Sequence, residues 1–318
     1  MKLETVRVAA VQATPVMLDV EGCVAKAEAL VRSAADEGAE LVVLPECFIP
    51  FYPMSRLTHS NWDPRQTDLF EQIWLNAVEV PGPVTERLAG VCSELEVYLA
   101  IGVNEREPDR SGSLYNTLLL FGPDGFVHKH RKLMPTNHER LFHAIGDGSD
   151  LDVAETAVGR IGALTCWENF MPLARYLIYR KRPQLWLAPT MDDSDLWPSL
   201  IRTIAWESGA WVISVCGLSS RADYPEGLSV VPPDGPDAFT RGGTMIVDPD
   251  GVVVAGPLYG EEGVLFADCD LRRTIRAKYA FDAVGHYSRE DTLLRQLTSE
   301  NDERLPLPST TDSHLPVS

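Results

Sequence analysis

The chain has 318 residues, of which 45% are apolar and 23% charged, as in an ordinary globular protein with a large core. Its 28 basic and 46 acidic side chains give a net charge of −18. This charge argues against a general nucleic-acid binder or a binder of anionic membranes, because both need an excess of Lys and Arg. We expect no membrane span either, since no run of about 18 apolar residues occurs.

The cysteines and the N-terminus indicate the compartment. The six cysteines are widely scattered: Cys23, Cys47, Cys92, Cys166, Cys216 and Cys269. Because none forms a CxxC pair, the pattern favours neither a disulfide framework nor a zinc ribbon. Glu4 and Arg7 interrupt the segment that a signal peptide would need to keep apolar, so the N-terminus is typical of a first strand. We therefore expect a cytoplasmic protein.

Apolar strand-like runs alternate with helical periodicity along the whole chain. The pattern predicts strands over 6–13, 39–46, 97–105, 159–166, 184–190, 210–217 and 262–270. It predicts helices over 22–38, 81–96, 171–181 and 195–209, and hairpins within 114–132 and 242–256. Roughly ten to twelve strands and five or six helices, with hairpins among βαβ units, indicate an α/β layered protein with mixed sheets.

Domain organisation follows from the segments that lack periodicity. No polar linker divides the core, so we expect a single domain over residues 1–295. Residues 48–66 and 219–241 form two long loops, which in a compact domain usually serve function or an interface. Residues 296–318 are polar and Pro-rich, and we expect a disordered tail there.

Three polar residues end apolar strands and are candidates for chemistry. Glu46 ends "LVVLPE", Lys132 ends "FVHKHRK" and Cys166 ends "IGALTC". Ligands of open α/β sheets gather at the carboxyl ends of strands, so these residues could supply a base, a cation and a nucleophile to one site.

Each of the three also has a structural interpretation. Cys166 taken alone is more often inert core, and Glu46 taken alone could cap a turn. Lys132 lies in the basic run 128–132, which is typical of a solvated face. Their coincidence at three strand ends favours a site, because a buried glutamate is costly unless paired and a lysine offsets that cost.

The position of Cys166 favours a reactive thiol. A cysteine at the start of a helix lies near unpaired backbone N–H groups and the positive end of the helix dipole. Both stabilise a thiolate, as a nearby lysine does, so we expect a lowered thiol pKa.

The resemblance to a known family lies in three stretches: "LVVLPECFIPFYP", "HRKLMPTNHERLFHAIGDGS" and "LTCWENFMPLARY". Together they resemble the nitrilase superfamily of carbon–nitrogen hydrolases, over roughly residues 5–290. With "FDAVGHYSR" (281–289) the likeness extends to the true nitrilase branch. The chain departs from the family at His143 and Ala144, where an aromatic residue followed by glycine is more usual.

The resemblance implies a four-layer αββα sandwich with two mixed sheets and a triad of Glu46, Lys132 and Cys166. Glu139 matches a second glutamate, which in the family positions the lysine and the intermediate. It further implies a homodimer or a larger spiral homo-oligomer, with interface insertions over 50–75 and 220–241.

The implied reaction is hydrolysis of a small nitrile by water to the carboxylic acid and ammonia, through a thioimidate and an acyl-enzyme at the cysteine. We expect neither metal nor cofactor; His128 and His130 could be metal ligands, but no further ligands cluster with them. Within the fold, an amidase, ureidase, carbamoylase or cyanide-hydrolysing enzyme is the alternative. A scaffold without turnover is the alternative of another class, and the four polar residues disfavour it.

Substrate-binding candidates flank these residues. Trp167 could offer its backbone N–H to developing charge, and Thr190 ends the strand 184–190. Tyr52 is the best pocket candidate of an aromatic group that could line the pocket mouth or fill a subunit interface: Phe48, Phe51, Tyr52 and Trp62.

Overall fold

Two mixed sheets organise the chain in this computed structural model, which describes residues 3–54, 62–108, 112–225 and 237–297. The first sheet has the strand order β14-β1-β2-β4-β5-β6, with β3 beside β4. Its strands are β1 (Thr5–Gln12), β2 (Leu41–Val43), β3 (Val78–Glu79), β4 (Tyr98–Arg106), β5 (Leu114–Gly122), β6 (Gly125–Arg131) and β14 (Gly263–Asp270). β1, β2 and β4 run parallel; β14 pairs antiparallel with β1, β5 with β4, and β6 with β5.

The second sheet has the order β11-β12-β10-β9-β8-β7, with β13 beside β12. Its strands are β7 (Val153–Thr156), β8 (Gly159–Ala163), β9 (Leu185–Thr190), β10 (Trp211–Cys216), β11 (Leu218–Ser220), β12 (Ala238–Val247) and β13 (Val253–Tyr259). β8, β9 and β10 are parallel, so each sheet has a parallel centre with antiparallel neighbours.

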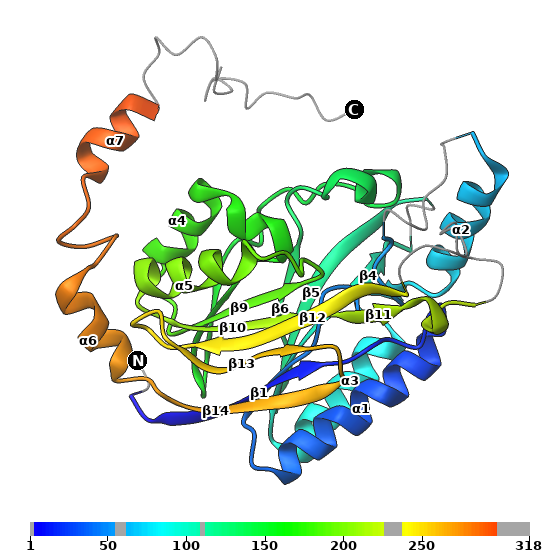
Figure 1. The fold of residues 1–318 in the computed structure, drawn as a ribbon, viewed down its shortest axis with the longest axis horizontal. Helices are drawn as coiled ribbons and strands as arrows, with labels where there is room; N and C mark the ends of the chain where they lie inside the picture. Colours follow the sequence, from blue (N-terminus) through cyan, green and yellow to red (C-terminus); the bar gives the residue numbers. More distant parts are fainter. Residues whose placement is uncertain (1–2, 55–61, 109–111, 226–236, 298–318) are drawn as a thin grey trace, which may run out of the picture.

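Four helices lie in two pairs on the outer faces of the sheets (Figure 1). The first sheet is covered by α1 (Val20–Asp36) and α3 (Pro83–Leu95), and the second by α4 (Pro172–Arg180) and α5 (Trp197–Ser208). The remaining helices are α2 (Pro64–Leu75), α6 (Arg273–Ala280) and α7 (Glu290–Leu297). One apolar core fills the space between the sheets and one lies under each helix pair, so the predicted αββα order of layers is confirmed.

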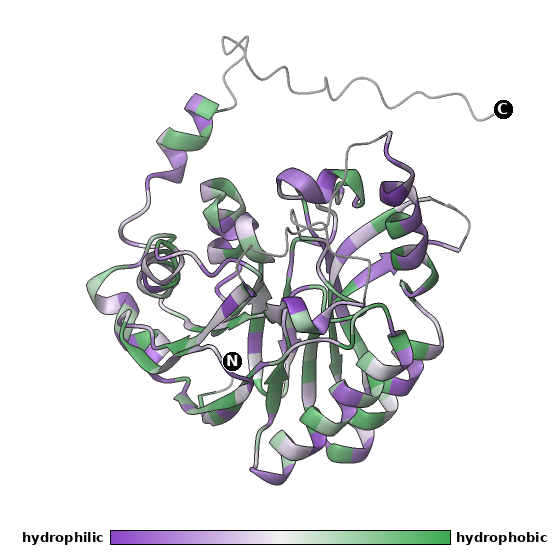
Figure 2. Ribbon diagram, turned by 45° about the vertical axis from the view of Figure 1, so that its right-hand side comes forward, coloured by the Kyte–Doolittle hydropathy of each residue, from purple (hydrophilic) through white to green (hydrophobic). Residues whose placement is uncertain are grey.

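The periodicity of the sequence explains the layers. In β1, Val6, Val8 and Ala10 face the other sheet, whereas Ala9 and Val11 face the helices, because successive side chains of a strand alternate. Both faces are therefore buried, and the strand is apolar throughout. The outer helices instead carry hydrophobic and hydrophilic residues along the same helix, as Figure 2 shows.

Short elements account for most differences from the predicted ones. The described residues contain fourteen strands and seven α-helices, more than the roughly ten to twelve strands and five or six helices predicted. Strands as short as β3 and β11 show no periodicity in the sequence, so the pattern does not predict them. α2 begins inside the predicted loop 48–66, where Pro64 occupies the first turn and Asp63 accepts from the N–H of Arg65.

The predicted domain end, tail and loops lie at or beyond the ends of the described segments. α7 continues to Leu297, two residues beyond the predicted domain end at 295. The rest of the predicted tail, 298–318, and parts of both predicted loops, 55–61 and 226–236, lie outside the described residues. The single-domain boundary stays a prediction. None of the helices in the described ranges is long and apolar enough to cross a membrane.

Gly102 allows the segment that follows β2 to pack closely against β4. The N–H of Gly102 in β4 donates to the carbonyl of Pro45 at 3.1 Å, and a Cβ at position 102 would meet the backbone of Glu46 and Cys47. Gly102 is therefore the residue that allows the segment carrying Glu46 to lie directly on β4.

We predict that Gly102→Ala lowers the free energy of unfolding by about 1–3 kcal/mol, because overpacking displaces backbone here. Denaturant unfolding measures the change. The matched control is Gly90→Ala, an exposed site in α3 with nothing near the added Cβ. It should stabilise by up to about 1 kcal/mol, as alanine does in a helix. Equal stability of the two variants would contradict the account.

Candidate active site

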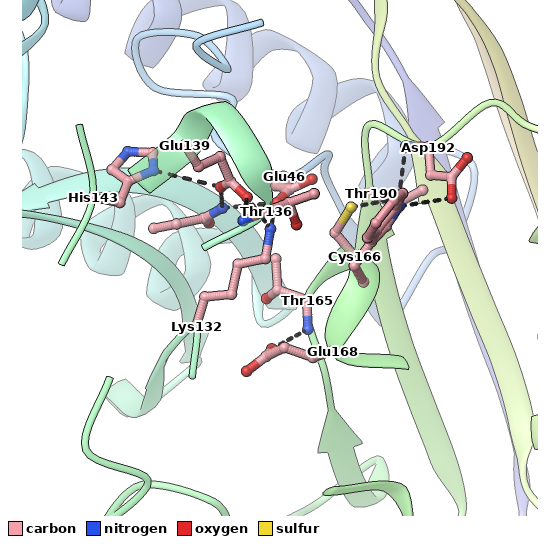
Figure 3. A network of polar contacts seen from close by, with 12 residues as sticks. Glu46, Lys132, Thr136, Glu139, His143, Thr165, Cys166, Glu168, Thr190 and Asp192 are labelled. Carbon is pink, nitrogen blue, oxygen red and sulfur yellow. Dashed lines mark hydrogen bonds and ion pairs between the residues drawn. The ribbon is translucent and has the colours of Figure 1, made fainter. Parts of the chain in front are cut away.

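Lys132 is the centre of a buried polar cluster that sequence reasoning placed at three strand ends. It follows β6 directly, and its backbone is fixed by bonds to the carbonyl of Asn116 at 2.8 Å and from the N–H of Gly146 at 2.9 Å. Its side chain has no solvent exposure, and Nζ donates to Glu46 Oε1 and to Glu139 Oε2, both at 2.7 Å. Figure 3 shows the two carboxylates converging on this ammonium group.

Glu139 is held by more partners than Glu46. It lies in the 3₁₀ helix η2 (Asn137–Leu141), where its Oε2 also accepts from the N–H of Thr136 at 2.5 Å. Nδ1 of buried His143 lies 3.4 Å from Oε1. By contrast, Oε2 of Glu46 is buried and has no hydrogen-bond partner among the residues that the structure describes.

Asn116 joins the two carboxylates. Its Nδ2 donates to Glu46 Oε1 at 2.7 Å and to Glu139 Oε1 at 2.8 Å. Sequence reasoning missed this residue, although the signal was there: it is an amide inside the otherwise apolar run "LYNTLLLF". A buried amide in a strand needs partners, and here the partners are the carboxylates of the site.

The two buried carboxylates beside Lys132 have pKa values shifted in opposite directions. Burial raises the pKa of Glu46, and the charge of Glu139 adds to this, against the opposing effect of Lys132. For Glu139, Lys132 and His143 outweigh burial and hold its pKa below the ordinary value. Burial opposes the charge of Lys132, but Glu46, Cys166 and Glu139 keep its pKa well above the usual range. Glu139 and Lys132 therefore stay charged, and Glu46 is the group suited to exchange a proton.

Cys166 stands at a sharp turn after β8. Its φ of 53° is in the left-handed region, which costs a residue with a Cβ about 1–2 kcal/mol. Asn169 holds the turn by donating to the carbonyls of Leu164 and Cys166 at 2.8 and 3.0 Å. The Oγ1 of Thr190 donates to Sγ at 3.2 Å, from the end of the neighbouring strand β9.

Of two sequence expectations about this turn, one is confirmed and one is wrong. Cys166 stands at the start of a helix, the short 3₁₀ helix η3 (Cys166–Phe170), and the helix predicted over 171–181 is α4, which begins at Pro172. The pKa of its thiol is raised, not lowered, because burial and the charges of Glu46 and Glu139 outweigh Lys132. The resting thiol is therefore protonated and needs a base.

A cavity of about 410 Å³ opens onto the thiol. Cys166 lies at its floor with Tyr52 and Trp167 in its walls, and the remaining lining residues are Met54, Thr136, Asn137, His138, Met191, Asp192 and Asp193. The ring of Tyr52 lies 6.0 Å from Nζ of Lys132, and Nε1 of Trp167 donates to Asp192 Oδ2 at 2.9 Å. This volume fits a small organic substrate.

The structure thus brings all four predicted polar residues into one cluster and sorts the predicted substrate contacts. Tyr52 and Trp167 line the cavity. Thr190 does not line the cavity, but donates a hydrogen bond to the sulfur of Cys166. Of the other aromatic candidates, Phe48 and Phe51 are core residues, and Trp62 is 96% exposed. Sequence reasoning did not find the lining residues His138, Met191 and Asp192. His138 lies in the short 3₁₀ helix η2, and Met191 and Asp192 follow β9 in a loop, so neither segment is long enough to show periodicity.

Comparisons with known proteins agree with this fold and identify the family. Residues 7–279 match the family model described as carbon–nitrogen hydrolase. An aliphatic nitrilase from Sinorhizobium fredii is 46% identical over 90% of this chain and 93% of its own length. A bifunctional nitrilase/nitrile hydratase from Lupinus angustifolius is 41% identical over 91% of this chain and 85% of its own. A carbon–nitrogen hydrolase structure from Helicobacter pylori superposes with a TM-score of 0.73 at 19% identity, covering 93% of this chain and 99% of that one.

The chain belongs to the carbon–nitrogen hydrolase family. The predicted membership of the nitrilase superfamily, the predicted class of enzyme and the predicted fold are confirmed by these relatives. The particular branch is that of the nitrilases, which the 41–46% identity over most of the chain supports.

We predict that Cys166 reacts faster with iodoacetamide than any other cysteine, because all six are buried and Cys166 is the one that lines this cavity. Peptide mass spectrometry over time measures the rate at each cysteine. Cys92, buried in α3, is the internal control, and its earlier labelling would contradict the assignment.

Proposed function

We propose that the protein hydrolyses an organic nitrile to the carboxylic acid and ammonia, with Cys166 as nucleophile, Glu46 as general base and Lys132 as the cation that stabilises the intermediates. The observation that carries the proposal is Oε2 of Glu46, which has no hydrogen-bond partner within the described ranges, on a carboxylate of raised pKa near a protonated thiol. A nitrile carbon is a modest electrophile, so attack on it requires a thiolate rather than a thiol.

The first half of the reaction forms a thioimidate. Glu46 takes the thiol proton as Sγ bonds to the nitrile carbon and one carbon–nitrogen π bond breaks. The nitrogen takes the proton back from Glu46. Charge developing on the nitrogen is stabilised by Lys132 and by the backbone N–H of Trp167. This N–H lies in the first turn of η3, where backbone N–H groups have no carbonyl partner within the helix.

The second half consumes two water molecules. Glu46 removes one proton from the first water, whose oxygen bonds to the thioimidate carbon, and passes that proton to the nitrogen. The new hydroxyl group gives up its proton to the nitrogen as well, through Glu46, and the carbon–nitrogen bond breaks to release ammonia. The thioester that remains is attacked by the second water in the same way. The carbon–sulfur bond then breaks, the acid is released, and the proton returns to Cys166. Glu139 stays ionised throughout and keeps Lys132 charged and in place.

The likeness to the family supports several further proposals. The substrate is a small nitrile with an apolar aliphatic or arylaliphatic group, which Tyr52, Met54 and Trp167 can contact. We propose a single domain over residues 1–295, a cytoplasmic location and a homodimer or larger spiral homo-oligomer. The oligomer would use segments around 50–75 and 220–241 as interfaces.

We predict that Cys166→Ala lowers kcat for nitriles by at least about 10⁴-fold and that Glu46→Gln and Lys132→Met each lower it by about 10²-fold or more. Ammonia release from a nitrile panel measures kcat, and circular dichroism checks folding. Cys92→Ala is the matched control, since it removes a buried thiol outside the site and should keep wild-type kcat. A Cys166→Ala variant with near wild-type ammonia release would refute the proposal.

The same panel separates nitrile from amide chemistry. Because a relative is described as bifunctional, acid and amide products should both be quantified. Turnover of amides with none of the matching nitriles would replace the proposed activity by an amidase.

A further inference from the structure

A second buried cluster joins the two chain segments that carry Lys132 and Cys166. We call it the histidine bridge, and it consists of Asp150, His130 and Glu168. Nδ1 of His130 lies 2.8 Å from Asp150 Oδ1, and Nε2 lies 3.0 Å from both carboxylate oxygens of Glu168. His130 is only 3% exposed, and the side chain of Glu168 is fully buried.

Glu168 contacts the backbone on both sides of the candidate active site. Its Oε1 accepts from the N–H of Leu133 at 2.6 Å, and its Oε2 accepts from the N–H of Thr165 at 2.7 Å. Leu133 directly follows Lys132, and Thr165 directly precedes Cys166. Figure 3 shows Glu168 below Thr165, on the far side of the turn from the sulfur. One carboxylate therefore ties the backbone segment that carries the cation to the segment that carries the nucleophile.

The histidine must carry two protons for this arrangement to be satisfied. Both ring nitrogens face carboxylates, and a neutral imidazole has only one N–H to donate. Although burial opposes the charge, Glu168 and Asp150 raise the pKa of His130 to about 10. The other titratable neighbours are His128, whose pKa burial lowers, and Asp152 beside it. The surroundings from the facing strands are apolar and include Leu118, Ile161 and Leu187.

We infer that His130 is a positioning residue: as an imidazolium held by Asp150, it neutralises buried Glu168, which holds Lys132 and Cys166 in register for the proposed reaction. Loss of the imidazolium charge leaves Glu168 without a cation among the described residues, and the two segments lose their common anchor. This role rests on the proposed function only for its kinetic consequence, since the protonation of His130 can be observed directly.

The direction of the pH effect follows from the sign of the shift. The charged form of His130 is present below its raised pKa and is lost as pH rises through that value. Positioning, and with it kcat, is therefore lost on the alkaline side. Removing the charge of Asp150 removes one of the two groups that raise the pKa, so the loss moves to lower pH.

Asp150→Asn tests the inference, because asparagine keeps an oxygen for Nδ1 but no charge. We expect the titration of His130, followed by ¹⁵N NMR of histidine-labelled protein and assigned with His130→Gln, to move down by about one pH unit or more. The alkaline limb of kcat for the best nitrile of the panel should move with it. Asp147→Asn is the matched control: Asp147 is exposed, bonds to Ser149, and should shift neither curve.

Each outcome bears on one claim. Titration of wild-type His130 near its ordinary pKa, or an unmoved curve in Asp150→Asn, overturns the histidine bridge. His130→Gln should lower kcat at least about tenfold with KM changed less than about threefold; an equal loss at all pH values in both His130→Gln and Asp150→Asn would indicate packing alone. A wild-type protein inactive on every nitrile would overturn the proposed function, while the NMR titration would still decide the bridge.

Discussion

Two buried carboxylates, Glu46 and Glu139, share one ammonium group, that of Lys132. The properties of the site follow from this excess of negative over positive groups. A single cation cannot neutralise two buried carboxylates at once, so one of them must have a raised pKa. The backbone N–H of Thr136 and the imidazole side chain of His143 both favour the charged form of Glu139. Glu46, one oxygen of which has no partner in the part of the chain that the structure describes, becomes the group that exchanges protons with the thiol.

The fold supplies this cluster because the two sheets bring the ends of four strands to one place. Glu46 follows β2, Lys132 follows β6, Cys166 follows β8 and Thr190 ends β9. Close approach depends on glycine twice: a Cβ at Gly102 or at Gly146 would meet the backbone beside Glu46 or Lys132. The left-handed backbone at Cys166 stores strain in the turn that presents the sulfur, and Thr190 and the histidine bridge hold that turn.

Apolar periodicity and strand ends are local signals, so the mixed sheets and the positions of Glu46, Lys132 and Cys166 could be predicted from the sequence. Glu139 and the αββα order of layers were implied only by the resemblance to the family. The sequence did not allow the pKa of Cys166 to be predicted, since burial and the charges of Glu46 and Glu139 come from distant segments. Asn116 could have been found from its place in an apolar strand. The roles of His130 and Glu168 could not, because their partners are backbone groups and Asp150, which are brought together only by the fold.

The claim that Glu46 is the proton-exchanging carboxylate can be tested without turnover. Infrared difference spectroscopy on ¹³C-glutamate-labelled protein follows the protonated carboxyl stretch as a function of pH. The account predicts a buried carboxyl group that protonates above the ordinary glutamate pKa of 4.5 and whose band disappears in Glu46→Gln. Loss of that band in Glu139→Gln, with the band intact in Glu46→Gln, would contradict it.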